Sequence, residues 1–272
     1  MRMKRLVFGA IVCAAVLLAA AAIGSARQNQ PGQQGQAAAA PAALYNTVKQ
    51  KLMDGKQVFG GTLLTKDTAA AKKMAAEGYD FLWIEMQHSP MTYESAADII
   101  KECQGLPAIP FLRVPDATDS DIQKATDIGA LGIIIPMVET VEKAQAAVKY
   151  AKYPPVGRRS TGSNQARSIW GDTYRATAND NIMVVVQIES VEGVAMVDKI
   201  AAVPGVDVVF AASADLASFS GSKAGEASYE ALITKIHDAT LKAGKWLAGP
   251  GAWAERKGFT FFQGRPSPPK VK

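Results

Sequence analysis

The chain has 272 residues, of which 48% are hydrophobic and 20% are charged, a composition typical of a globular protein with one substantial core. It excludes a disordered tail, a collagen and a small module held together by disulfides. The 30 Lys and Arg residues against 25 Asp and Glu give a net charge of +5, and loss of the three basic residues in the N-terminal leader would leave 27 against 25, or +2. That balance argues against nucleic-acid binding.

The first 43 residues read as a targeting segment followed by a linker. Residues 1–5 include three basic residues, residues 6–24 are apolar, and Gly24, Ser25 and Ala26 are the small residues that a signal peptidase requires. We therefore expect residues 1–26 to be a signal peptide, with an uncleaved membrane anchor formed by residues 6–24 as the alternative. Under both interpretations the folded domain lies outside the cytoplasm, and we expect a periplasmic protein. Residues 27–43 are a low-complexity linker of Gln, Ala, Gly and Pro, so the folded domain spans residues 44–272.

The chain contains two cysteines. Cys13 lies in the leader and Cys103 in the body. A mature chain would retain one of them and form no intramolecular disulfide.

Beyond residue 57, short apolar runs alternate with amphipathic helical stretches. Such runs are typical of parallel strands whose outer face is covered by helices. Eight strand candidates occur, at residues 57–65, 80–86, 109–114, 132–138, 183–190, 206–212, 245–249 and 259–264. The expected helices are residues 67–78, 92–105, 120–129, 141–153, 194–203 and 229–244. The pattern predicts an α/β fold, a (β/α)8 TIM barrel. A doubly wound open sheet is the alternative, but no GxGxxG follows the first strand.

Residues 153–181 interrupt this alternation with a polar stretch that is too long for a simple connection. One interpretation is a turn. The other is a lid or aldehyde-binding segment in which Arg158 or Arg159 contacts an acidic group. Trp170 and Tyr174 are expected to pack this segment against the body, with a position lining the substrate entrance as the alternative.

Polar residues close several of the apolar strands, and barrel enzymes carry their chemistry at the carboxyl ends of the strands. These residues are Glu85, Gln87 and His88 after the second strand, Arg113 after the third, Gln187 and Glu189 after the fifth, and Asp215 after the sixth. Glu189 and Asp215 come from adjacent strands and are expected to converge. Two carboxylates, together with oxygens of water and substrate, suit Mg²⁺ or Mn²⁺.

This set of side chains suits the formation of an enolate from a 2-oxo acid bound to the metal ion. Arg113 would hold a carboxylate or the developing oxyanion, His88 would move a proton, and Glu85 would orient the imidazole. Each residue also has a plainer interpretation. Four such alternatives remain open: a solvated strand end for Glu189, a helix cap for Asp215, an ion pair for Arg113 and a turn for His88.

The motifs resemble those of the metal-dependent 2-oxo acid aldolases of the HpcH/HpaI family. The likeness lies in GYDFLWIEMQHSP, FLRVP, ATDIGALGIIIPMVETVEKAQAAVKYAKYPPVGRRS, VVVQIES and GVDVVFAASADLA. The resemblance implies a TIM-barrel lyase that reversibly cleaves a 4-hydroxy-2-oxo acid to pyruvate, or a related 2-oxo acid, and an aldehyde. It implies Mg²⁺, Mn²⁺ or Co²⁺ on Glu189 and Asp215, with His88 as the proton-transfer residue. Substrate binding falls to Arg113, Gln187, the backbone of Ser213 and Ala214, and Asp127, the last at a neighbouring subunit's site.

Three features of the chain depart from the family pattern. The family's Asp-x-Glu-His is here Glu85, Met86, Gln87 and His88, the C-terminus runs into a Pro-rich basic segment where the family has a last helix, and a leader precedes the domain. The alternative function is therefore an exported, non-catalytic binding protein on a degenerate barrel. We expect a homo-oligomer, the hexamer of the family, and membrane contact only if the leader stays uncleaved. A lyase acting on a coenzyme A thioester is disfavoured.

Overall fold

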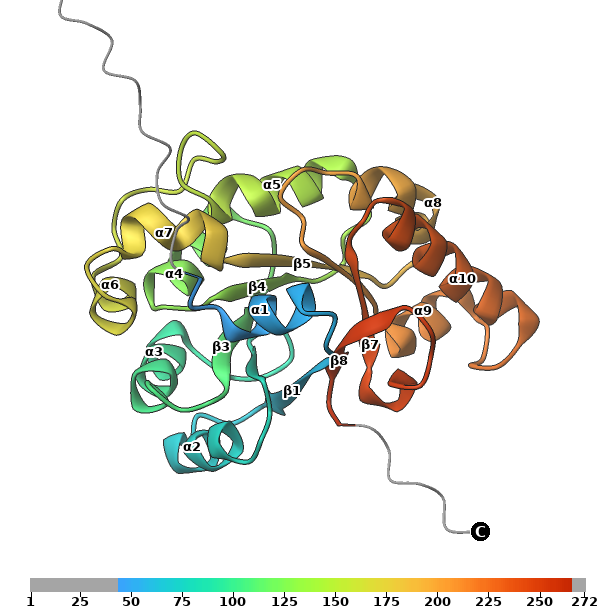
Figure 1. The fold of residues 1–272 in the computed structure, drawn as a ribbon. Helices are drawn as coiled ribbons and strands as arrows, with labels where there is room; N and C mark the ends of the chain where they lie inside the picture. Colours follow the sequence, from blue (N-terminus) through green and yellow to red (C-terminus); the bar gives the residue numbers. More distant parts are fainter. Residues whose placement is uncertain (1–43, 266–272) are drawn as a thin grey trace, which may run out of the picture. The chain divides into compact units, whose positions relative to one another are not determined.

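Eight parallel strands close into a barrel in sequence order (Figure 1). The structure, a computed structural model, describes residues 44–265. The strands are β1 Val58–Leu63, β2 Phe81–Glu85, β3 Ile109–Arg113, β4 Gly132–Ile135, β5 Met183–Ile188, β6 Val208–Ala211, β7 Trp246–Pro250 and β8 Phe259–Gln263. β8 pairs with β1, so the prediction of a closed TIM barrel is confirmed and the open sheet is not formed.

The strands are buried on both faces, which explains their nearly unbroken apolar sequences. One set of side chains fills the barrel, and it includes three aromatic rings in mutual contact, from Phe81, Phe111 and Phe261. Two glycines make room for these rings. A Cβ atom on Gly60 would lie 2.1 Å from the ring of Phe81, and one on Gly132 would lie 1.9 Å from that of Phe111.

Helices follow the first six strands and cover the barrel from outside (Figure 1). Their bounds are α2 Thr68–Ala76, α3 Tyr93–Glu102, α4 Asp119–Asp127, α5 Val141–Ala151, α8 Val191–Ala201 and α10 Ala227–Lys242. For the first five, an Asp, Thr or Ser side chain before the helix accepts a backbone N–H of its first turn. A further helix after β6, α9 Ser213–Ser220, was not predicted, and β7 is followed by the short 3₁₀ helix η1 Gly251–Trp253.

A short helix, α1 Thr47–Met53, lies at the amino-terminal end of the barrel. Val48 and Leu52 on its inner side pack with the residues that fill the barrel. Before it, the Asn46 amide donates to the carbonyls of Leu131 and Asn181 at 3.1 and 2.6 Å, at the starts of β4 and β5. These contacts fix the helix across the strand ends.

The long polar stretch is partly helical, which the sequence did not predict. It contains α6 Asn164–Trp170 and α7 Tyr174–Asn181. Because it connects the end of α5 to the start of β5, it lies at the amino-terminal end of the strands. It therefore forms no lid over the carboxyl ends of the strands of its own chain.

The predicted signal peptide, its alternative as an anchor, and the linker of residues 27–43 lie outside the described residues. So does most of the Pro-rich C-terminal segment, which carries the expectation of a missing last helix: the described chain ends at Arg265, two residues after β8. Within residues 44–265, no helix is both long and apolar enough to cross a membrane.

Candidate functional site

A pocket of about 170 Å³ opens at the carboxyl ends of the strands. Six of the predicted site residues line it: His88, Arg113, Gln187, Ser213, Ala214 and Asp215. They come from loops or strand ends of β2, β3, β5 and β6, so residues far apart in the chain meet there because the strands are parallel and closed.

Glu189 and Asp215 form a close pair of carboxyl groups at this end of the barrel. Glu189 follows β5 and is only 2% exposed, and its Oε1 accepts the N–H of Met137 at 3.1 Å. Asp215 stands in the first turn of α9, after the neighbouring strand β6. Burial, and secondarily the charge of Asp215, raise the pKa of Glu189 to about 7. A pair of carboxylates in such an environment favours a bound cation, which would offset their repulsion.

The two carboxylates fit a divalent metal ion that keeps open coordination positions. No group of three or more His, Cys, Asp or Glu side chains able to hold a metal occurs within residues 44–265. An all-protein cage is therefore not formed there. Mg²⁺ and Mn²⁺ are commonly bound by one or two carboxylates, with oxygens of water and substrate completing the shell.

Arg113 is held firmly in place. Its Nε donates to Glu85 Oε2 at 2.6 Å, its Nη1 donates to Gln187 Oε1 at 3.4 Å, and its guanidinium carbon lies 5.7 Å from the centre of the Trp83 ring. The strand register pairs Glu85 with Arg113, which explains why the two side chains meet. Arg113 is 8% exposed and lines the pocket, where its remaining N–H donors are available to a ligand.

Glu85 does not bind the imidazole of His88. Its Oε1 accepts the backbone N–H groups of Gln87 and His88 at 2.7 and 3.0 Å. Within the described residues no hydrogen bond joins its carboxylate to the ring, and the prediction that Glu85 orients the imidazole finds no contact to support it. His88 is exposed at the rim of the pocket.

The amino terminus of α9 supplies backbone donors. No side chain within residues 44–265 caps this helix, and its first residues, Ser213 and Ala214, line the pocket. The first N–H groups of a helix have no partner inside it, and the helix dipole makes this end positive. The position suits a carboxylate, which is the ligand that the family resemblance implies for these two residues.

Three residues around the pocket were missed. Gln263 closes β8 and lines the pocket, and the rule that identified the other polar strand ends would have found it. Trp83 precedes Glu85 by two residues, so strand alternation places both on one face, and its Nε1 donates to Glu85 Oε2 at 3.2 Å. Met137, with a φ of 50°, turns its N–H toward Glu189, and no signal in the sequence indicates this conformation.

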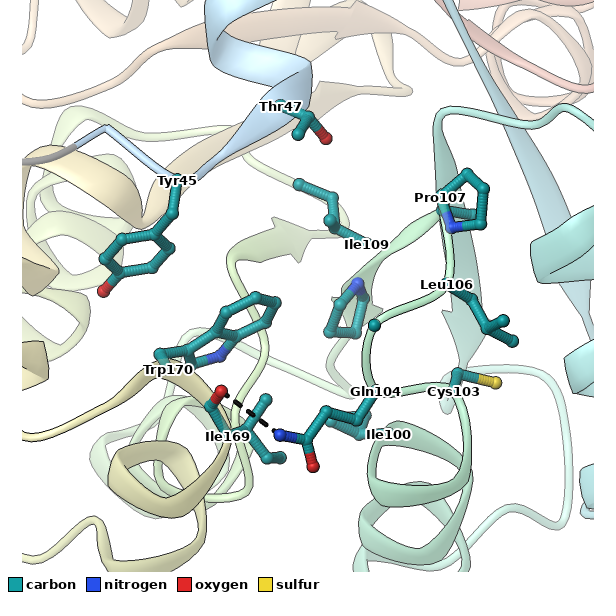
Figure 2. A pocket seen from close by; sticks show the side chains of 13 residues that line it. Tyr45, Thr47, Ile100, Cys103, Gln104, Leu106, Pro107, Ile109, Ile169 and Trp170 are labelled. Carbon is teal, nitrogen blue, oxygen red and sulfur yellow. Dashed lines mark hydrogen bonds between the residues drawn. The ribbon is translucent and has the colours of Figure 1, made fainter.

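A second pocket, of about 220 Å³, lies at the amino-terminal end of the barrel (Figure 2). Apolar side chains from the end of α3, the loop to β3, and α6 line it, with the rings of Tyr45 and Trp170 stacked 5.4 Å apart at one side. Its one ionisable group besides Tyr45 is Cys103, and burial raises the pKa of that thiol. It offers no acid, base or cation ligand of the kind found at the first pocket.

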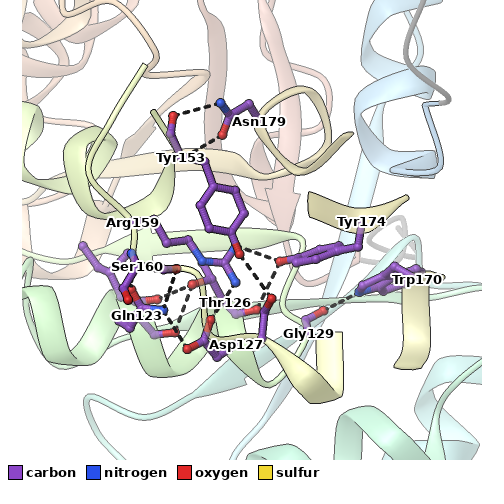
Figure 3. A network of polar contacts seen from close by, with 12 residues as sticks. Gln123, Thr126, Asp127, Gly129, Tyr153, Arg159, Ser160, Trp170, Tyr174 and Asn179 are labelled. Atoms are coloured by element: carbon purple, nitrogen blue, oxygen red, sulfur yellow. Dashed lines mark hydrogen bonds and ion pairs between the residues drawn. The ribbon is translucent and has the colours of Figure 1, made fainter. Parts of the chain in front are cut away.

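Asp127 is not brought to the site of its own chain. It ends α4 and therefore lies toward the amino-terminal end of the strands, where its Oδ1 accepts Arg159 Nη2 at 2.8 Å (Figure 3). Arg159 is 2% exposed and also donates to the hydroxyl of Tyr174 at 2.8 Å. Arg159 thus contacts an acidic side chain of its own chain at the amino-terminal end of the barrel, and not an acidic group at a lid over the pocket. The buried Tyr174 and the Trp170 Nε1 bond to the Gly129 carbonyl, 2.9 Å long, show the expected packing.

With this geometry established, comparison with known proteins identifies the family. A sequence model of the HpcH/HpaI aldolase/citrate lyase family matches residues 63–246, more than half of the chain. The chain belongs to this family. The predicted resemblance is confirmed.

Similar proteins support the same class of enzyme. A 2-keto-3-deoxy-L-rhamnonate aldolase of Salmonella gallinarum is 33% identical over 223 residues, which cover 79% of this chain and 84% of the relative. A hydroxypyruvate/pyruvate aldolase of Roseobacter denitrificans is 38% identical over 184 residues, or 66% and 72% of the two chains. A solved structure of a family protein from Burkholderia cenocepacia J2315 superposes with a TM-score of 0.75 and 30% identity, covering 81% of this chain and 93% of the other. Like its relatives named as aldolases, this HpcH/HpaI protein is a carbon–carbon lyase.

Proposed function

We propose that the protein is a metal-dependent aldolase that reversibly cleaves a 4-hydroxy-2-oxo acid to pyruvate, or a related 2-oxo acid, and an aldehyde. The observation that carries this proposal is that His88, Arg113 and Asp215 line one pocket, with the Glu189 carboxyl group beside that of Asp215. A 2-oxo acid presents a carboxylate and a ketone on adjacent carbons. The guanidinium of Arg113 can bind the carboxylate, and the neighbouring pair of carboxyl groups can hold a metal ion that binds the ketone. The relatives' names favour catalysis over the alternative of a non-catalytic binding protein.

Glu189 and Asp215 would hold the metal, which we propose to be Mg²⁺ or Mn²⁺, with Co²⁺ as a further candidate. When bound, the ion supplies Lewis-acid polarisation of the substrate's ketone oxygen. Arg113, with Gln187 beside it, binds the substrate's carboxylate or the oxygen on which charge develops. The N–H groups of Ser213 and Ala214 provide a second binding position for the carboxylate.

His88 is proposed to move the proton. In cleavage, the bond between C3 and C4 breaks, the 4-hydroxyl loses its proton as the aldehyde forms, and C3 gains a proton to give the methyl group of pyruvate. An exposed imidazole at the rim of the pocket can exchange protons with water between these steps. Replacement by Ala is expected to slow proton transfer by ~10²–10⁴-fold.

The test is exchange of the pyruvate methyl protons in D₂O, followed by NMR, with Mg²⁺ or Mn²⁺ compared with EDTA. It requires no knowledge of the aldehyde. Metal-dependent exchange that is slowed in His88→Ala would support the proposal and justify a screen of aldehydes. Absence of exchange from a folded protein with bound Mn²⁺ would contradict the assignment of pyruvate.

We further propose that the enzyme acts outside the cytoplasm, in the periplasm, as a homo-oligomer. The leader supports export, and membership of the HpcH/HpaI family supports assembly, while the polar group around Asp127 is joined to Arg159 within its own chain. If a neighbouring subunit brings this group to the mouth of the barrel, Asp127 would contribute to the substrate site there, as the resemblance implies.

A further inference from the structure

We propose that Glu85 is a positioning residue that aims Arg113 into the pocket, and that it is not the acid partner of His88. The inference deepens the proposed function, on which it rests for the role of Arg113 as the residue that binds the substrate's carboxylate. It assigns to Glu85 a role different from the one that the position of a carboxylate three residues before a histidine suggests.

The hydrogen bonds of Glu85 leave no acceptor position for the imidazole. Oε2 accepts Arg113 Nε at 2.6 Å and Trp83 Nε1 at 3.2 Å, and Oε1 accepts the backbone N–H groups of Gln87 and His88 at 2.7 and 3.0 Å. A carboxylate has about four lone-pair positions, two on each oxygen. All four are engaged, and at 1% exposure the side chain has no room to turn toward another donor.

The contacts of Arg113 determine which of its donors face the substrate. Glu85 takes the Nε–H, on the side of the guanidinium, and Gln187 takes one hydrogen of Nη1. The remaining hydrogens belong to the terminal nitrogens, and Arg113 lines the pocket. Because the Trp83 ring centre lies 5.7 Å from the guanidinium carbon, the plane of the guanidinium group is also restrained. Glu85 thus leaves free the terminal nitrogens of Arg113, which can bind a carboxylate.

The length of the Glu85 side chain matters for this role. The carboxylate joins the turn after β2 on one side to a side chain of β3 on the other. An aspartate would withdraw the carboxylate by about 1.5 Å, the length of one carbon–carbon bond. It could keep the backbone N–H groups or Arg113, but not both. The longer acid therefore couples the position of the His88 backbone to the aim of Arg113.

Two variants of the metal-loaded full-length enzyme separate the two roles. Glu85→Gln is expected to weaken pyruvate binding about tenfold, since a charge-assisted hydrogen bond to Arg113 is lost, and to change exchange at saturating pyruvate by less than about threefold. Glu85→Asp is expected to weaken binding to a similar extent. If Glu85 were the partner of His88, Glu85→Asp would retain the exchange rate and pyruvate binding, and that result would overturn the proposal.

A double-mutant cycle tests whether Glu85 acts through Arg113. In an Arg113→Ala background, Glu85→Gln should weaken pyruvate binding less than twofold further. The same tenfold loss in both backgrounds would contradict the inference. So would a cycle in which Glu85→Gln slows exchange in the parent enzyme but has no effect in a His88→Ala background.

A readout without substrate keeps this inference distinct from the proposed function. In the ¹H–¹⁵N NMR spectrum, the Nε–H of Arg113, identified by its loss in Arg113→Lys, should exchange slowly with water in the parent and rapidly in Glu85→Gln. Equal protection in both would overturn the inference. If the parent shows this protection but no pyruvate exchange, the positioning role stands while the assignment of pyruvate fails.

Discussion

Glu189 carries a carboxyl group in surroundings that oppose its charge, because it is 2% exposed and stands beside Asp215. Such an arrangement costs stability in a protein without a bound ion and favours function once the ion is present. The same residue therefore gives two predictions, one for metal binding and one for the stability of the metal-free protein.

Glu189→Ala and Asp215→Ala are each expected to reduce metal-dependent exchange by at least ~100-fold, because each removes one of the two carboxylates that we propose hold the ion. Mn²⁺ affinity, measured by electron paramagnetic resonance, should fall in parallel while circular dichroism shows an intact barrel. Glu192→Ala, which changes an exposed carboxylate in the first turn of α8, is the matched control. Unchanged turnover in either of the first two variants would exclude them as ligands.

The stability of the metal-free protein should depend on pH through Glu189. Its pKa is about 7 in the folded state against an ordinary 4.5, so the folded protein binds more protons between these values and stability is lost as pH rises from 4.5 through 7. Glu189→Gln does not ionise, and at pH 8 in EDTA we expect it to exceed the parent by ~1–3 kcal/mol. Near pH 4.5 the difference should vanish. Urea unfolding at both pH values measures it, and an equal difference at the two would show that ionisation of Glu189 is not its cause.

The connection between α5 and β5, considered from its sequence as a possible lid, instead packs at the amino-terminal end of the barrel. Arg159 lies within it, enclosed between Asp127 and the rings of Tyr153 and Tyr174, with its guanidinium carbon 4.5 and 5.4 Å from the two ring centres. This network fastens α7 to α4 at the amino-terminal end of the barrel. In barrels that end contributes to stability, while the carboxyl ends of the strands carry chemistry.

Arg159→Ala is expected to destabilise the protein by ~3 kcal/mol, because it leaves the Asp127 carboxylate and the Tyr174 hydroxyl without their buried partner. Arg158→Ala, at the exposed neighbouring position, should change stability by less than ~0.5 kcal/mol. The pair is matched in chemistry and sequence, so thermal or urea unfolding of both isolates the effect of burial. Similar values for the two would show that the network contributes little to stability.

For the whole molecule, the predicted leader determines the cellular compartment in which we expect the enzyme to act. The predicted targeting signal, residues 1–26, lies outside the barrel in the sequence, so the barrel and its pocket do not indicate where the enzyme is located. We predict that the chain expressed in a bacterium is recovered from the periplasm with Arg27 as its first residue, as judged by intact-mass spectrometry. An uncut chain in the membrane fraction would support the anchor instead, and an uncut chain in the cytoplasm would contradict export.

The sequence alone determined the architecture, because parallel strands buried on both faces must be continuously apolar and the alternation with helices repeats through the chain. It also identified most residues of the pocket, since a charged or polar residue such as Arg113 or Glu189 at the end of an apolar strand has few structural reasons to be there. It missed α1, α6, α7 and α9, whose short polar or small-residue sequences give weak helical periodicity and which tertiary contacts stabilise.

Only the tertiary structure decided the partners of these side chains. Spacing placed Glu85 three residues before His88 and suggested a pair, yet the strand register sets Glu85 against Arg113, and the backbone of the following turn takes its other oxygen. Likewise, Asp127 and the segment around Arg159 carry polar residues of the type found in active sites, but the direction of α4 places them at the opposite end of the barrel. Periodicity fixes which face and which end of an element a residue occupies, whereas hydrogen-bond partners depend on register and closure, which involve residues far apart in the chain.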